Sequence, residues 1–100
     1  ERPMQWQVDA GQGTLDDELK KLGVDTVVQV GAWTDDCIIA TAFHAFALQY
    51  DVIVVTDGVS TASKNHFKAL DVMGGAVAKM LDTAAIVAHL AGGGAAAKKP

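Results

Sequence analysis

The sequence predicts an α/β protein built on a parallel sheet. Two short runs rich in β-branched residues, 26–30 and 52–56, are typical of strands. Between them, residues 35–49 have apolar side chains almost all the way round a helix, which indicates a helix buried on several sides. Continuous apolar strands joined by such a helix favour neighbouring parallel strands in a three-layer α/β/α arrangement.

A first helix is expected over residues 15–22. Thr14 is suited to cap it, and Gly23 is suited to end it. Charged residues fit the helix dipole at both ends, acidic at the start and basic at the finish: Asp16, Asp17, Lys20 and Lys21.

After the second strand, Asp57-Gly58 is expected to end the sheet segment. Residues 63–80 then predict a helix with Ser63 as its cap, weakened by two consecutive glycines. Its apolar stripe consists of Phe67, Leu70, Met73, Val77 and Met80. A last helix is expected from a Thr83 cap to about residue 90.

The chain divides into three parts. Residues 1–13 show no clear period and are interpreted as a loop or a remnant of a missing N-terminal half. Residues 14–91 form the folded part, and residues 92–100 form a Gly/Ala/Lys tail that is expected to be flexible. Two strands are too few to bury their own faces, so we expect only a partial domain. A homo-oligomer or a companion chain would complete the sheet.

Composition excludes several classes of function. A formal charge of −4, without a basic patch, argues against nucleic-acid binding. No apolar run reaches the roughly 18 residues that a membrane span needs. The single cysteine rules out an internal disulfide and suits an intracellular, reducing compartment, either cytoplasmic or organellar.

Cys37 is the residue most suited to chemistry. It lies at the start of a helix that directly follows a strand and a tight turn, and ligands bind at this end of open α/β sheets. Backbone N–H groups in a first helical turn favour a thiolate and can hold an oxyanion. From the spacing alone, the alternative is that Cys37 is a small core residue of a buried helix.

Five short motifs follow one another in order: LGVDTVV at 22–28, GAWTDDCI at 31–38, ATA at 40–42 with Ala45, YDVIVVTD at 50–57, and His66 with Ala69-Leu70. Together they resemble the C-terminal half of the isochorismatase-like cysteine hydrolases. The resemblance implies a Rossmann-like parallel sheet and the hydrolysis of a small amide or related C–N bond.

The same resemblance implies roles for individual residues. Cys37 would attack the substrate carbonyl carbon and form an acyl-enzyme, and the backbone N–H groups of Trp33 and Cys37 would form the oxyanion hole. A cis peptide would join Ala32 to Trp33. Trp33 is also a candidate pocket wall, with a core or interface role as the alternative. No cofactor or metal is expected.

The chain departs from the family pattern in its basic and acidic partners. The resemblance also implies an aspartate that acts as base and a lysine that helps to position it. The aspartate belongs to an N-terminal strand with no counterpart here, and the region expected to hold the lysine has Arg2 as its nearest basic residue. Arg2 could position and neutralise but could not shuttle protons. The sequence therefore also allows a non-catalytic structural or interaction subunit of a larger assembly.

The other polar residues that could take part in chemistry can also be explained by structural roles. Asp35 and Asp36 could act as a base, but acidic residues are also favoured at a helix start. His44 is interpreted as packing and His89 as surface, whereas His66 could face the pocket or cap a helix. None of these residues has convincing metal-ligand spacing.

Overall fold

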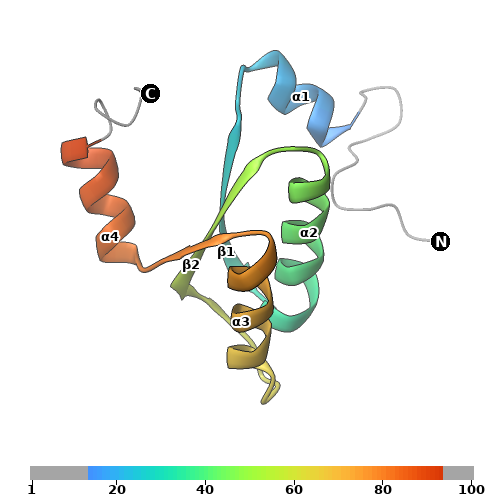
Figure 1. Ribbon diagram of the computed structural model, residues 1–100, viewed down its shortest axis with the longest axis vertical. Coiled ribbons are helices and arrows are strands. Elements are labelled where there is room, and N and C mark those ends of the chain that lie inside the picture. The colour runs from blue at the N-terminus through green and yellow to red at the C-terminus, as the bar shows by residue number, and fades with distance from the viewer. Residues whose placement is uncertain (1–13, 94–100) are drawn as a thin grey trace.

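The computed structural model describes residues 14–93, which contain a parallel three-stranded sheet (Figure 1). The strands are β1 (Thr26–Ala32), β2 (Asp51–Ser60) and β3 (Lys79–Leu81), in the order β1-β2-β3. Parallel pairing of β1 with β2 confirms the α/β prediction. The predicted N-terminal loop and most of the predicted tail lie outside the described residues.

Helices cover both faces of this sheet. Figure 1 shows α2 and α3 on one side of the strands and α4 on the other. In chain order the helices are α1 (Leu15–Lys21), η1 (Thr34–Ile38), α2 (Ile39–Ala47), α3 (His66–Ala76), α4 (Thr83–Ala88) and η2 (His89–Gly93). The last of these includes Gly92 and Gly93, which the sequence analysis assigned to the tail.

The core lies between β2 and the helices α2 and α3. Val52 and Val54 face this core, whereas Val55 is buried on the opposite face, where α4 contacts β2. On β1 the opposite face is open, because Val28 is 48% exposed and Val30 is 62% exposed. Exposed aliphatic residues next to each other on one sheet face indicate a surface that this part of the chain leaves uncovered.

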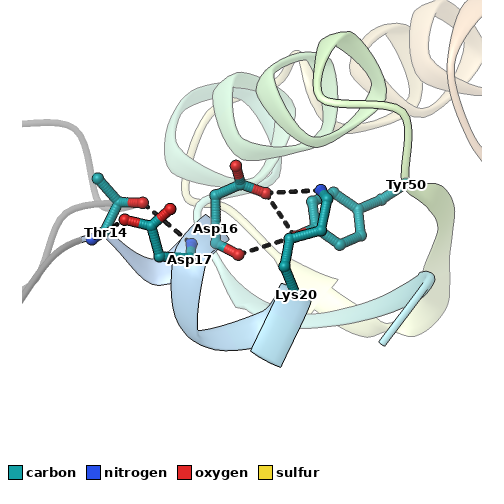
Figure 2. A network of polar contacts seen from close by, with 5 residues as sticks. All are labelled: Thr14, Asp16, Asp17, Lys20 and Tyr50. Atoms are coloured by element: carbon teal, nitrogen blue, oxygen red, sulfur yellow. Dashed lines mark hydrogen bonds and ion pairs between the residues drawn. The ribbon is translucent and has the colours of Figure 1, made fainter. Parts of the chain in front are cut away.

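The helix α1 is capped and docked as Figure 2 shows. Thr14 Oγ1 accepts the N–H of Asp17 at 3.1 Å, and the Asp17 carboxylate accepts the N–H of Thr14 at 3.2 Å, which forms a capping box. Tyr50 donates its hydroxyl to Asp16 Oδ1 at 2.6 Å, and Lys20 Nζ lies 2.9 Å from the same oxygen. These two donors, Tyr50 first, lower the pKa of Asp16. The network joins α1 to the start of β2.

The predicted end of the second strand at 57–58 is wrong, because β2 continues past it. The pairing shifts there: Gln29 lies opposite Val54, but Gly31 lies opposite Val59. Between these pairs β2 carries extra residues, so β1 and β2 form an irregular bulge. Gly31 has φ +120°, a conformation that side-chain-bearing residues rarely adopt, so glycine fits this position.

The single helix predicted over 63–80 is also wrong at its C-terminal end. Helix α3 closes where the Met73 carbonyl accepts the N–H groups of both Val77 and Ala78, at 2.8 and 2.9 Å. The chain then forms the short strand β3. Met80 fits the helical spacing as well as it fits a strand, and three residues are too few to reveal a period of two.

The two other predicted helix caps are displaced by one or two residues. Asn65, rather than Ser63, is the N-cap of α3, and the Ser63 hydroxyl instead accepts the N–H of Asn65 at 2.9 Å. Asp82, rather than Thr83, caps α4 by accepting the N–H of Ala85 at 2.8 Å. In both cases the sequence offers several suitable capping residues side by side.

Candidate functional site

The chain makes a tight turn between β1 and α2. The peptide from Ala32 to Trp33 is cis. The Trp33 carbonyl accepts the N–H groups of Asp36 and Ile38, both at 3.1 Å. The bond from Ile38 is of the π-helical kind, so η1 is a π-turn and the α-helix predicted from residue 35 begins only after it. Asp35, with φ −95° and ψ 16°, lies in the sparsely populated bridge region of backbone conformations.

Cys37 lies within this π-turn, at the carboxyl end of β1, and its side chain is exposed. Within residues 14–93, Cys37 is therefore not a core residue. π-turns interrupting α-helices are frequent at functional sites, and ligands of open α/β sheets bind at this edge. The location is the one that the strand–turn–helix pattern predicted.

Two hydrogen bonds tie the π-turn to the segment between β2 and α3. The Thr34 side chain is fully buried, and its Oγ1 lies 2.9 Å from His66 Nδ1. Thr61 donates its hydroxyl to Asp35 Oδ1 at 2.8 Å. His66, for which the sequence left two roles open, lies half-buried at the start of α3 and contacts the turn rather than capping the helix. Both ends of the β2–α3 connection are thus fastened beside Cys37.

The carboxyl group of Asp35 is a hydrogen-bond acceptor in this arrangement. The Thr61 hydroxyl, followed by the Ser63 hydroxyl, lowers the pKa of Asp35. A carboxylate with a lowered pKa is a weaker proton acceptor, so Asp35 is poorly suited to be a general base at neutral pH. Its role here is to fix the turn to the neighbouring loop.

A shallow hollow of about 340 Å³ lies beside the turn. Its lining consists of Trp33, Asp35, Asp36, Thr61, Ala62 and Ser63. The indole of Trp33 is 48% exposed and forms one wall, which excludes a fully buried core role for it. Cys37 is not part of the lining and lies next to Asp36 on the exposed side of the turn.

A larger cavity, of about 740 Å³, lies at the opposite edge of the sheet. It is lined by the first residues of all three strands, together with residues of α2, α3, η2 and the loops beside the strands: Thr26, Phe46, Tyr50, Asp51, Val52, Ile53, Gly74, Gly75, Ala76, Val77, Ala78, Lys79 and His89. None of the predicted site residues lines it. We favour the smaller hollow as the functional one because Trp33, Asp35 and Asp36, at the turn that carries Cys37, line it at the carboxyl ends of the strands.

Two histidines among the candidates lie away from the turn. His44 is half-buried on α2, and His89 is exposed on η2. Arg2, the proposed basic helper, lies outside the described residues. Within residues 14–93, no three His, Cys, Asp or Glu side chains are grouped so that they could hold a metal ion, and no helix is long and apolar enough to cross a membrane.

Three polar residues that shape the turn have no role predicted from the sequence. Gln29 is buried on β1, Thr34 is buried in the turn, and Thr61 follows β2. The sequence alone could have drawn attention to Gln29, because it is a long polar residue inside an otherwise apolar strand. It could not have indicated the roles of Thr34 and Thr61, because their contacts join segments that lie far apart in the sequence.

Comparisons with known proteins agree with this geometry. The model of the Isochorismatase domain matches residues 6–85. An uncharacterized isochorismatase family protein of Bacillus subtilis (strain 168) is 40% identical over 55 residues, which are 55% of this chain and 29% of that protein.

Two solved structures extend the likeness. An isochorismatase-like hydrolase from Alkaliphilus metalliredigens has a TM-score of 0.70 at 32% identity, over 78% of this chain and 44% of that one. A pyrazinamidase/nicotinamidase from Streptococcus mutans UA159 has a TM-score of 0.60 at 37% identity, over 69% of this chain and 40% of that one. The chain thus spans less than half the length of each of these relatives. The match over residues 6–85, with the parallel sheet and the cysteine-bearing turn, places this chain in the isochorismatase family, which includes nicotinamidase hydrolases.

Proposed function

We propose that this chain supplies the nucleophile-bearing part of a cysteine hydrolase that cleaves a small amide or related C–N bond. The observation that carries the proposal is the exposed Cys37 in a π-turn at the carboxyl end of β1. Asp35 and Asp36 of the same turn, with Trp33 as an aromatic wall, line a hollow. Family membership supports the hydrolase class, and the nicotinamidase relative supports an amide substrate.

The chemistry would run in two steps. The Cys37 thiolate attacks the substrate carbonyl carbon, the C–N bond breaks, and the nitrogen leaves as an amine after it takes up a proton. Water then attacks the resulting thioester, releases a carboxylic acid and returns the thiol. The N–H groups of Trp33 and Cys37 would stabilise the negative oxygen in both steps.

A general base is needed to take the thiol proton and later the water proton. Asp35 is poorly suited because the Thr61 hydroxyl lowers its pKa. The proposal therefore assigns the base, and the lysine that assists it in the family, to an N-terminal half or a companion chain outside these 100 residues. Arg2 remains the proposed basic helper within the chain.

The cellular setting follows from the same chemistry. A cysteine nucleophile must stay reduced, which suits the cytoplasm or a reducing organelle.

The exposed Val28 and Val30 support a second copy or a companion chain that covers the sheet.

The test is acyl-enzyme capture. The full-length protein is mixed with small amides, nicotinamide among them, quenched in acid and digested, and the Cys37 peptide is examined by mass spectrometry. We expect a mass increase equal to the acyl group on Cys37, and its absence in Cys37→Ser. Turnover that survives in Cys37→Ala would overturn the nucleophile assignment. Absence of both turnover and acylation across the amide panel would favour the non-catalytic subunit.

A further inference from the structure

A buried glutamine lies directly beneath the cysteine-bearing turn. Gln29 is only 7% exposed, and it occupies the face of β1 that is directed at α2 and α3. An amide removed from water is costly unless it forms hydrogen bonds, so its partner identifies what it does. Gln29 Nε2 donates to the backbone carbonyl of Ile38 at 3.2 Å. Its Oε1 is also buried and has no hydrogen-bond partner among the described residues.

The acceptor of that bond is the residue that follows Cys37. Ile38 ends the π-turn, and its own N–H donates to the Trp33 carbonyl at 3.1 Å. The carbonyl of Ile38 therefore receives the Gln29 amide while its N–H is held by the turn. The orientations of the peptide groups on both sides of Ile38 are thus fixed. The Trp33 carbonyl holds the peptide group before Ile38, and the Gln29 side chain on β1 holds the peptide group after it.

Backbone anchoring matters here because the Cys37 side chain is exposed. An exposed side chain has little core packing around it, so the way the backbone beneath it is held contributes to its direction. A small misplacement of a reacting atom has a large effect on rate. Thr34 and Thr61 fasten the start of the turn, and Gln29 fastens its end.

We propose that Gln29 is a positioning residue for Cys37, acting through the Ile38 carbonyl to set the direction of the sulfur. This inference rests on the proposed function only in that Cys37 is the reacting group. Gln29 itself touches no substrate. Its donor NH₂, rather than its size or its acceptor oxygen, is what the role requires.

The test replaces the donor while keeping the shape. Gln29→Met and Gln29→Leu have uncharged side chains of similar size and lack the NH₂ group. The matched control is Val27→Ala, which removes packing from the same face of β1 without touching the turn. For each full-length variant, we would measure the rate of Cys37 alkylation by iodoacetamide against pH, the urea midpoint of unfolding, and kcat and KM on any amide that is hydrolysed.

We expect both Gln29 variants to lower the pH-independent alkylation rate, and kcat where it is measurable, by about fivefold, the equivalent of one neutral hydrogen bond. KM should stay unchanged. Val27→Ala should lower the urea midpoint and leave both rates alone. If the Gln29 variants lower the midpoint but keep the wild-type rates, Gln29 is merely structural and the proposal is wrong.

The alkylation rate keeps this result separate from the proposed function. If no amide is hydrolysed, the hydrolase proposal fails, whereas the alkylation series still decides whether Gln29 directs the thiol.

Discussion

The hydrogen bond between Thr34 and His66 offers the sharpest test of how the turn is held. Thr34 is fully buried, and its Oγ1 lies 2.9 Å from His66 Nδ1. Thr34→Val replaces the hydroxyl by a methyl group of similar size, so it removes the bond with little change in packing. The variant should loosen the contact between η1 and the start of α3.

The expected loss follows from the burial of the two partners. A neutral hydrogen bond contributes about 1 kcal/mol net, and the loss rises to about 3 kcal/mol when the abandoned partner is left buried. His66 is half-buried and can turn its ring nitrogen to water, which places the expected loss near 1 kcal/mol. Such a loss lowers the melting temperature by about 4–8 °C in a domain of about 60–100 residues and by about 2–4 °C in one of about 150–250 residues.

A double-mutant cycle isolates this one contact. Urea unfolding of the full-length protein would be measured for Thr34→Val, His66→Leu and the double variant. We expect a coupling free energy of about 1 kcal/mol. Thr34→Ser, which keeps the hydroxyl and loses only the methyl group, should retain the coupling with His66. A coupling indistinguishable from zero would refute the argument that this bond fastens the turn.

Three further predictions concern the thiol, the acidic residue beside it and the docking of α1. Cys37→Ala should abolish amide hydrolysis by the full-length protein while leaving the urea midpoint nearly unchanged, because the side chain is exposed; normal turnover would contradict this. Since Thr61 lowers the pKa of Asp35, its contribution to stability is present above about pH 4 and is lost as pH falls through the lower folded-state pKa. Thr61→Val should therefore be less stable than wild type at pH 7, with a difference that shrinks in urea titrations below pH 4; a gap that does not depend on pH would count against the reasoning. Tyr50→Phe removes the donor to Asp16 and should speed amide hydrogen exchange in α1 but not in α3, whereas equal acceleration in both helices would show that α1 is not docked by this bond.

Most of the fold could be predicted because local patterns and tertiary packing agree. The β-branched run of β1 and the start of β2 lie where the sequence predicts them, and the apolar α2 lies within the predicted helix. Thr14 caps α1 as expected, with the predicted acidic and basic ends. These elements have strong propensities and leave few alternatives.

The wrong predictions concern segments whose backbone conformation is set by tertiary contacts rather than by the secondary-structure propensity of their residues. The start of β3 was assigned to a helix because Met80 continues a helical stripe. The bulge in β2 passes through Asp57-Gly58, a pair that ordinarily marks a turn. In this protein the Asp57 carboxylate instead accepts the N–H and hydroxyl of Thr83, and both bonds lower its pKa.

The sequence predicted where Cys37 lies, but it predicted neither the type of turn nor the contacts that support it. The strand–turn–helix pattern located Cys37, and the family motifs supplied its proposed role. The π-turn could not be predicted, because its five residues resemble an ordinary first helical turn. The supporting contacts of Gln29 and Thr34 depend on which segments meet in space, which spacing along the chain does not reveal.

The short connection from β2 to α3 differs from most surface loops in how it should tolerate changes of length. Surface loops usually accept insertions, because the residues in the middle of a loop make few contacts with the rest of the protein. Here Thr61 bonds to Asp35, His66 bonds to Thr34, and Ser63 bonds within the loop itself. An added residue would change the spacing between two anchors that both hold the cysteine-bearing turn. A change of length between residues 61 and 66 should therefore be tolerated poorly.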